Sequence, residues 1–191
     1  MSTAIKNTLQ FFWEVAKIVI LAFAIVLPIR YFLFQPFVIQ GSSMEPNFHQ
    51  ADYLIVDEIT YRFRAPERGE VVVFKYPLDT SKRFIKRIIG LPGETIQIKD
   101  GQVTVTAADG QTINLDESQY LTADLKAPDC GPIILKPGQY FVLGDNRPWS
   151  SDSQDWGEVP STNIIGRVAL RLWPIDSLEK VATPQYQPSV K

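Results

Sequence analysis

The chain has only one cysteine and one histidine among its 191 residues. One cysteine cannot form an intramolecular disulfide, and one cysteine with one histidine cannot supply the ligands of a zinc finger. Catalysis that needs two histidines is also excluded. With a net charge of −2 and a pI near 5.5, the chain is a poor electrostatic partner for nucleic acid, so we expect none. If the chain is an enzyme, its general base is either His49 or a residue other than histidine.

Long hydrophobic runs are equally scarce, and the strongest lies between residues 11 and 34, with an unbroken apolar stretch over 18–29. That stretch is shorter than the roughly 20 residues of a membrane span, but aromatic and aliphatic flanks lengthen it. A cleaved signal peptide would need small residues directly after the stretch, where Arg30, Tyr31 and Phe32 stand. A buried core helix would need partner helices, and no comparable pattern occurs elsewhere. We therefore predict an uncleaved transmembrane anchor over 10–34.

The basic residues around this segment predict its orientation. Lys6 and Lys17 lie on its N-terminal side, and after Arg30 neither lysine nor arginine occurs before Arg62. The positive-inside rule then makes 1–9 a cytoplasmic tail and places the remaining chain on the exported side, whether periplasmic, extracytoplasmic or lumenal. A single cysteine is compatible with that location.

Beyond the anchor, short runs rich in β-branched and aromatic residues predict strands at 53–56, 70–76, 84–89, 95–98, 102–106, 133–135 and 140–143. Asp100-Gly101 between two alternating runs is the strongest hairpin signal. We expect a mainly β protein, with one N-terminal transmembrane helix followed by an antiparallel β core that carries a smaller, hairpin-rich β insertion. The expected core has two parts, 35–94 and 140–177, the insertion spans 95–139, and 178–191 forms a loose C-terminal tail.

Lys86 is the first candidate for chemistry. Strand alternation places it on one face with Phe84 and Ile88, and burial on an apolar face lowers a lysine pKa. A drop of about three units, which corresponds to about 4 kcal/mol, would allow lysine to accept a proton near neutral pH. The alternative is an amphipathic edge strand with a solvated lysine, and this segment alone favours that alternative.

Two further segments hold candidate side chains. Ser43 could be a nucleophile if a base took its proton, although 41–43 could equally be a plain Gly-Ser loop. A polar cluster follows a predicted strand, and it consists of Asp145, Asn146, Arg147, Ser150, Asp152 and Ser153. By itself this cluster is equally compatible with a hydrogen-bonded turn.

Taken together and in this order, the segments resemble the bacterial type I signal peptidases, membrane-anchored serine proteases with a Ser–Lys dyad. The sequence GSSMEP at 41–46 resembles the family's nucleophile box, and RGEVVVF at 68–74 resembles its strand box. KRIIGLPG at 86–93 resembles the lysine box, and GDNR at 144–147 with the serines and aspartate after it resembles the last box. The resemblance covers about residues 10 to 175.

The resemblance implies a membrane-bound serine endopeptidase that cuts exported preproteins at small-x-small sites, with Ser43 as nucleophile and Lys86 as general base. It implies that Ser150 holds the lysine amine and that the backbone N–H of Ser43 stabilises the oxyanion. The implied bracing residues are Asp145, Arg147, Asp152 and Arg87, and Gly41 is a further supporting residue of the site. The implied substrate pockets are lined by Phe37, Ile39, Leu54, Val73, Phe84, Ile85 and Val142. No metal or cofactor is implied, and the implied partners are preproteins and the lipid bilayer.

Several positions depart from the family pattern. Gly41 stands where some relatives have a serine that donates to the oxyanion, Asn47 replaces threonine, and Glu70 replaces aspartate. Pro148-Trp149 replaces a commonly polar pair, and Gln154 replaces arginine, which puts the ion pairing around Asp152 in doubt. Aromatic residues, namely Trp149, Trp156 and those between 32 and 37, could contact lipid or pack in the core.

Three other interpretations remain open. The chain could be a non-catalytic, membrane-tethered β domain that binds exported proteins. A self-cleaving Ser–Lys repressor is disfavoured by the anchor and by the lack of a DNA-binding module, and a mitochondrial inner-membrane relative would share the mechanism. His49 lies six residues after Ser43 in a polar loop, and such a tight local cluster favours a surface histidine over a catalytic triad.

Overall fold

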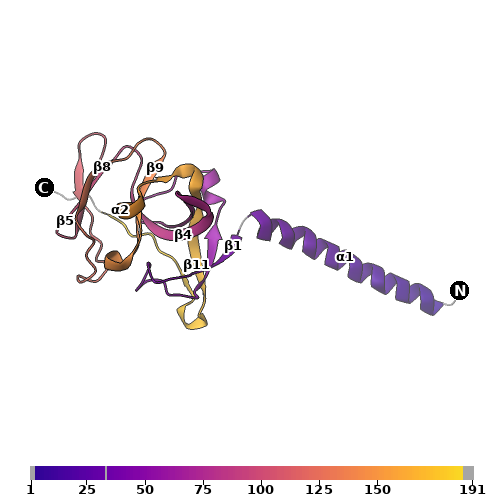
Figure 1. Ribbon diagram of the computed structural model, residues 1–191. Helices are drawn as coiled ribbons and strands as arrows, with labels where there is room; N and C mark the ends of the chain where they lie inside the picture. Colours follow the sequence, from indigo (N-terminus) through magenta and orange to yellow (C-terminus); the bar gives the residue numbers. More distant parts are fainter. Residues whose placement is uncertain (1–2, 33, 187–191) are drawn as a thin grey trace.

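The computed structural model describes residues 3–32 and 34–186. Helix α1 (Thr3–Phe32) extends away from a β-rich body (Figure 1). Among the described residues, no helix meets the length and hydropathy required for a membrane span. The predicted anchor at 10–34 therefore stays a prediction, and its residue 33, like residues 1–2 of the predicted tail, lies outside the described residues.

The body contains two antiparallel sheets, which confirms the expected mainly β, antiparallel fold. The larger sheet has the strand order β1-β2-β11-β3-β4-β9-β10, with β12 beside β11. Its strands are β1 (Phe34–Val38), β2 (Tyr53–Asp57), β3 (Val71–Tyr76), β4 (Asp79–Gly90), β9 (Gln139–Leu143), β10 (Val159–Pro160), β11 (Ile164–Trp173) and β12 (Glu179–Lys180). Five short helical segments connect them: η1 (Thr60–Arg62), η2 (Arg147–Trp149), α2 (Ser153–Trp156), η3 (Ser161–Asn163) and η4 (Ile175–Ser177).

The smaller sheet has the order β7-β6-β5-β8 and comes entirely from the middle of the chain. Its strands are β5 (Thr95–Lys99), β6 (Gln102–Thr106), β7 (Thr112–Asn114) and β8 (Cys130–Ile134). Asp100 and Gly101 join β5 to β6 with positive φ angles of 52° and 81°, as a tight two-residue hairpin turn requires. The hairpin predicted at this dipeptide is confirmed.

Strand β11 was not among the predicted strands, although it lies between β2 and β3 in the larger sheet. Its sequence alternates Val168, Leu170 and Leu172 with Arg167 and Arg171, so a period-two signal is present. Register shifts interrupt its pairing with both neighbours. The short strands β1, β7, β10 and β12 were also missed, because two to five residues carry little periodicity.

Packing between the sheets fixes the smaller one against β4 and β9. One buried cluster combines Ile89 and Phe141 of the larger sheet with Ile96 and Val103 of the smaller one. At Gly90 a Cβ atom would lie 2.7 Å from side-chain atoms of Ile96, so only glycine allows this approach. The end of β4 is thereby held in place by both sheets.

The end of the chain differs from the loose tail that we predicted for 178–191. Over 178–186 the segment pairs with β11 through β12, and Val181 N–H then donates to Ala169 O at 3.0 Å. The hydroxyls of Tyr186 and Tyr120 lie 2.9 Å apart. The prediction is wrong for 178–186, because Val181 and Tyr186 pack against the body, and 187–191 lie outside the described residues.

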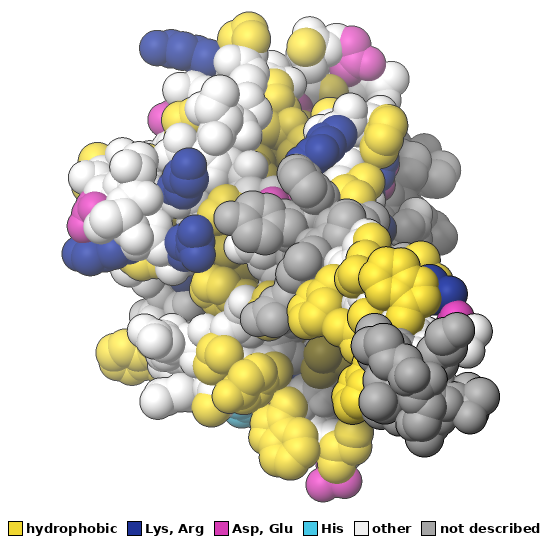
Figure 2. All heavy atoms as spheres, turned by 90° about the vertical axis from the view of Figure 1, so that its right-hand side faces the viewer, with side chains coloured by type: hydrophobic (Ala, Val, Ile, Leu, Met, Phe, Trp, Pro, Cys, Tyr) yellow, Lys and Arg dark blue, Asp and Glu magenta, His cyan; other side chains and the backbone are white. Residues whose placement is uncertain are grey.

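Several large hydrophobic side chains are exposed on the body. They include Tyr53, Phe63, Trp149, Trp173, Ile175 and Leu178. Figure 2 views the end of the molecule from which α1 projects, and hydrophobic side chains gather in the lower half of that face. Trp156 is different, since it packs against Phe74 and Tyr76 with ring centroids 5.9 and 5.6 Å apart.

Candidate active site

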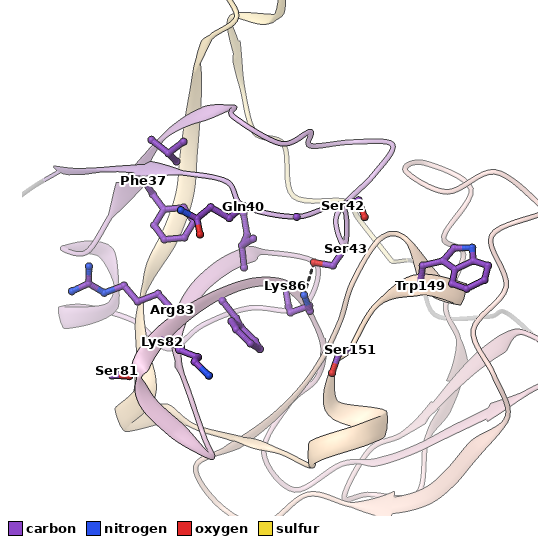
Figure 3. A pocket seen from close by; sticks show the side chains of 14 residues that line it. Phe37, Gln40, Ser42, Ser43, Ser81, Lys82, Arg83, Lys86, Trp149 and Ser151 are labelled. Atoms are coloured by element: carbon purple, nitrogen blue, oxygen red, sulfur yellow. Dashed lines mark hydrogen bonds between the residues drawn. The ribbon is translucent and has the colours of Figure 1, made fainter.

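Ser43 and Lys86 meet at the floor of an open cleft. Ser43 lies in the loop between β1 and β2, and Lys86 lies in β4, where it pairs with Val72 of β3. Lys86 Nζ donates a hydrogen bond to Ser43 Oγ over 2.6 Å (Figure 3). Lys86 is only 4% exposed, so the alternative of a solvated lysine, which its own segment favoured, is wrong. β3 pairs with this part of β4 along one edge, and the end of β9, at Leu143, pairs with the adjacent Arg87 on the other.

Burial lowers the pKa of Lys86 to about 8. Loss of water around the ammonium group is the main cause, and the nearby carboxylates of Asp152 and Asp145 oppose it. A lysine with this pKa is neutral in about one molecule in ten at pH 7, against fewer than about one in a thousand for an ordinary lysine. Its neutral amine has a lone pair that could accept the proton of Ser43 Oγ.

The cleft has a volume of about 700 Å³. Of the seven predicted pocket residues, Phe37, Phe84 and Ile85 line it. The other four are buried in the core instead, with Ile39, Leu54 and Val73 in one cluster and Val142 in another. Their placement in the pocket was wrong, because their side chains point into the sheet interior.

Gly41, a predicted supporting residue, also lines the cleft. The remaining lining residues were not predicted, and they are Val38, Gln40, Ser42, Ser81, Lys82, Arg83, Trp149 and Ser151. Val38 and Gln40 flank the buried Ile39, so alternation along this extended segment could have identified them. Residues 81–83 line the cleft because β4 begins at Asp79, well before Lys86, whereas the strand predicted from the sequence began only at residue 84.

The backbone before Ser43 explains one departure from the family pattern. Gly41 has φ of +91°, a conformation that side chains other than glycine adopt with strain. No other residue lies within 4 Å of the place where a Cβ would stand, so backbone conformation and not space disfavours serine here. Within the described residues the N–H of Ser43 has no hydrogen-bond partner, and it remains available to an oxyanion.

Arg87 and Asp145 form a buried ion pair beside the dyad. Arg87 Nε and NH2 donate to the two carboxylate oxygens of Asp145 over 2.8 and 2.6 Å, and Arg87 NH1 donates to Gly69 O. Asn47 Nδ2 donates to Asp145 Oδ2 and to Tyr120 O, both over 2.8 Å. The predicted bracing by Arg87 and Asp145 has this geometry, and Asn47 and Tyr120 are additions to it.

Arg147 braces the loop after β9 from the other side. It is 2% exposed, donates from Nε to Gly144 O over 2.9 Å, and binds both carboxylate oxygens of Glu117 over 2.8 and 2.5 Å. Glu117 belongs to the segment between β7 and β8, far along the chain from the dyad. The sequence carries no local signal for its part in the site, because only the packing of the two sheets brings it there.

Asp152 is fully buried and has no ion pair within the described residues. Its carboxylate accepts hydrogen bonds from the N–H groups of Gly144 and Gln154, over 3.1 and 3.2 Å, and burial raises its pKa. The Gln154 side chain is directed elsewhere, to Pro128 O. The ion pairing around Asp152 that Gln154 put in doubt is therefore not formed among the described residues.

Ser150 does not hold the lysine amine as the resemblance implied. Among the described residues its buried Oγ forms no hydrogen bond with Lys86 Nζ, which donates to Ser43 alone, and its hydroxyl opposes the rise in the pKa of Asp152. Ser150 packs instead on Gly144, where a Cβ atom would lie 2.1 Å from Ser150 Oγ and 2.4 Å from Ser43 O. Glycine at 144 is therefore required for the loop after β9 to lie against Ser43.

Comparison with known proteins agrees with the resemblance found in the sequence. A family model described as signal peptidase, peptidase S26, matches residues 12–173. The chain belongs to the signal peptidase family. The resemblance predicted from the four ordered segments is confirmed.

Named relatives of this signal peptidase family member span most of its length. A probable signal peptidase I-2 of Synechocystis is 42% identical over 168 residues, which cover 85% of this chain and 73% of the relative. A signal peptidase I of Leptolyngbya laminosa is 39% identical, covering 90% and 84%. A crystal structure of a signal peptidase I from Enterococcus faecalis has a TM-score of 0.45 and 28% identity, and covers 55% of this chain and 97% of that one.

His49 of this family member is exposed, as the sequence predicted, and does not line the cleft. Its backbone N–H donates to Asp52 Oδ2 over 2.9 Å, and replacement of the imidazole would leave this hydrogen bond in place. We expect His49→Ala to leave kcat/KM within about twofold of wild type, since exposed substitutions away from special features change little. Steady-state cleavage of a preprotein by the two proteins measures this, and a large loss would show that the imidazole takes part in catalysis.

Proposed function

We propose that this chain is a membrane-bound serine endopeptidase that removes signal peptides from exported preproteins at small-x-small sites. Ser43 is the nucleophile and Lys86 the general base. The observation that carries the proposal is the 2.6 Å contact between Ser43 Oγ and the buried amine of Lys86, both of which line a cleft of about 700 Å³. The signal peptidase names of the relatives support the substrate class.

The reaction follows from this geometry. Neutral Lys86 takes the proton from Ser43 Oγ as the oxygen attacks the scissile carbonyl carbon, and the N–H of Ser43 donates to the oxyanion. The Lys86 ammonium then gives its proton to the leaving amine, which releases the mature protein and leaves the signal peptide as an ester on Ser43. Lys86 next takes a proton from water as the water oxygen attacks the ester carbonyl, and it gives this proton to Ser43 Oγ as the ester bond breaks and the signal peptide leaves.

The cleft walls support a preference for small side chains next to the cut. Phe37, Phe84 and Ile85 are apolar and lie close to the dyad, so a pocket between them would accept alanine and exclude bulky groups. The free edge of β4 over 81–86 could pair with an extended substrate, because β9 pairs only with 87–90. Main-chain pairing would then align the peptide bond with Ser43.

We also propose the domain division and the topology predicted from the sequence. The separate smaller sheet supports 95–139 as an insertion into a catalytic core made of 35–94 and 140–177. The basic residues near the N-terminus support a single-pass anchor at 10–34 with a cytoplasmic N-terminus and an exported catalytic domain. The exposed Trp149, Trp173 and Ile175 support contact between the body and lipid.

The alternative of a non-catalytic, membrane-tethered β domain is less well supported. A binding module has no need for a lysine buried against a serine hydroxyl, and burying an ammonium group costs stability. Here both side chains are present and in contact.

A pH profile of cleavage tests the proposed function. Because the base must be neutral and its pKa lies at about 8, we expect kcat/KM to rise with pH through about 8 and to level off above it. The full chain in detergent should be assayed with a preprotein, and the product's new N-terminus sequenced. A flat profile from pH 6 to 10, or no cleavage at any pH, would contradict the assignment.

A further inference from the structure

The loop that carries Ser43 has a second side, away from the cleft. Residues 40–43 line the cleft, whereas Pro46, Asn47, Phe48 and His49 line a separate cavity of about 480 Å³. Strand β4 is divided in the same way, since Lys86 faces the cleft and Arg87 lines this cavity. Side chains in the second cavity can therefore act on the dyad only through the loop or through β4.

Arg171 is the residue of β11 that reaches this back side. Its NH1 donates to Asn47 O over 2.7 Å and to Asp52 Oδ2 over 3.3 Å. Its Nε donates to Ser177 O over 3.0 Å, and its NH2 binds Glu179 over 2.5 Å. One guanidinium thus joins the loop after Ser43 to the β11–β12 hairpin.

The two groups that Arg171 binds in the loop are themselves joined to the site. Asn47 donates through its side chain to Asp145, which pairs with Arg87 beside the dyad. Asp52 accepts the N–H of His49 over 2.9 Å and is 3% exposed, so it shapes the end of the same loop. Asp52 would be left buried without its cation if the arginine were removed.

We propose that Arg171 is a positioning residue, which holds the backbone of the Ser43 loop at Asn47 and Asp52 so that Ser43 Oγ stays within reach of Lys86. This inference rests on the proposed function. Arg171 does not line the cleft, so it acts on the nucleophile and not on substrate binding. Small displacements matter here, because a misplacement of about 1 Å can cost about 100-fold in rate.

Arg171→Met tests the inference, with Arg167→Met as a matched control. Arg167 lies on the same strand and also pairs with a carboxylate, Asp57, but makes no contact with the Ser43 loop. We expect R171M to lower kcat by about 10- to 100-fold with KM within about twofold, and R167M to keep kcat within about threefold. Full-length variants should be assayed well below their measured unfolding temperatures.

A more conservative variant, Arg171→Lys, tests the inference even if R171M does not fold. Arg171→Lys keeps one donor for Asn47 O but cannot also hold Asp52, Ser177 and Glu179, so we expect a kcat between those of R171M and wild type. An unchanged kcat in R171M, or in R171K if R171M does not fold, would overturn the inference. So would a rise in KM alone, or equal losses in R171M and R167M.

Failure of this inference is distinguishable from failure of the proposed function. If Ser43→Ala still cleaves the preprotein, the dyad assignment is wrong, whatever Arg171 does. If Ser43→Ala is inactive while R171M keeps the wild-type kcat, only the positioning role of Arg171 is refuted.

Discussion

Lys86→Met is expected to lower kcat/KM for preprotein cleavage by at least about 10³-fold, because it removes the general base while keeping a side chain of similar length. Ser43 Oγ would then lie against a thioether that cannot take its proton. The measurement is single-turnover cleavage of a preprotein at pH 9, where wild-type Lys86 is mostly neutral. Cleavage at the wild-type rate would exclude Lys86 as the base.

The same substitution is expected to raise stability. The pKa of Lys86 falls from 10.5 to about 8 on burial, which corresponds to a cost of about 3 kcal/mol in the folded protein. That cost is fully present below pH 8, where lysine is charged in both the folded and the unfolded chain, and it disappears as the pH rises toward 10.5. The free energy of unfolding of Lys86→Met should therefore exceed that of wild type at pH 7 by more than at pH 10.

Lys75→Met is the matched control for both measurements. Lys75 lies on β3, next to β4, and its side chain is exposed. We expect K75M to leave the cleavage rate, its pH dependence and the unfolding free energy close to those of wild type. A variant at 86 that is inactive and less stable than wild type at pH 7 would indicate misfolding and not loss of a base.

Ser43→Ala is expected to abolish cleavage, with a loss of about 10⁴-fold or more in kcat, since no acyl-enzyme can form without Oγ. The loop should keep its shape, because Asn146 binds the backbone carbonyls of Ser42 and Ser43 and not the Ser43 side chain. We therefore expect S43A to bind a preprotein as tightly as wild type and to leave it uncut. Binding can be measured by fluorescence anisotropy of a labelled preprotein.

Ser42→Ala provides the control for this loss. Ser42 is the neighbouring serine and also lines the cleft, but Lys86 contacts only Ser43 of the two. We expect S42A to keep kcat within about threefold of wild type. A large loss in S42A with retained activity in S43A would move the nucleophile to position 42.

The pairing of Ser43 with Lys86 could be inferred before the fold was known, because the ordered motifs are specific and the chain has only one histidine. Pocket residues were predicted less well. Phe37 and Ile85 line the cleft, yet Leu54 and Val142 are equally apolar and lie in the core. Apolar character alone does not distinguish a side chain that lines the cleft from one that is buried in the core. The difference depends on which face of each strand the rest of the protein covers.

The sequence by itself determined the β class of the body and the hairpin at Asp100-Gly101, because periodicity and turn residues are local properties, and its resemblance to the signal peptidase motifs implied the Ser43–Lys86 dyad. Only the tertiary structure decided the pKa of Lys86, since desolvation depends on the strands beside β4 and on Asp152 and Asp145. It also decided that Ser150 makes no hydrogen bond with the amine among the described residues and that Glu117 holds Arg147. These contacts join segments far apart in the chain, and close packing, not local sequence, selects them.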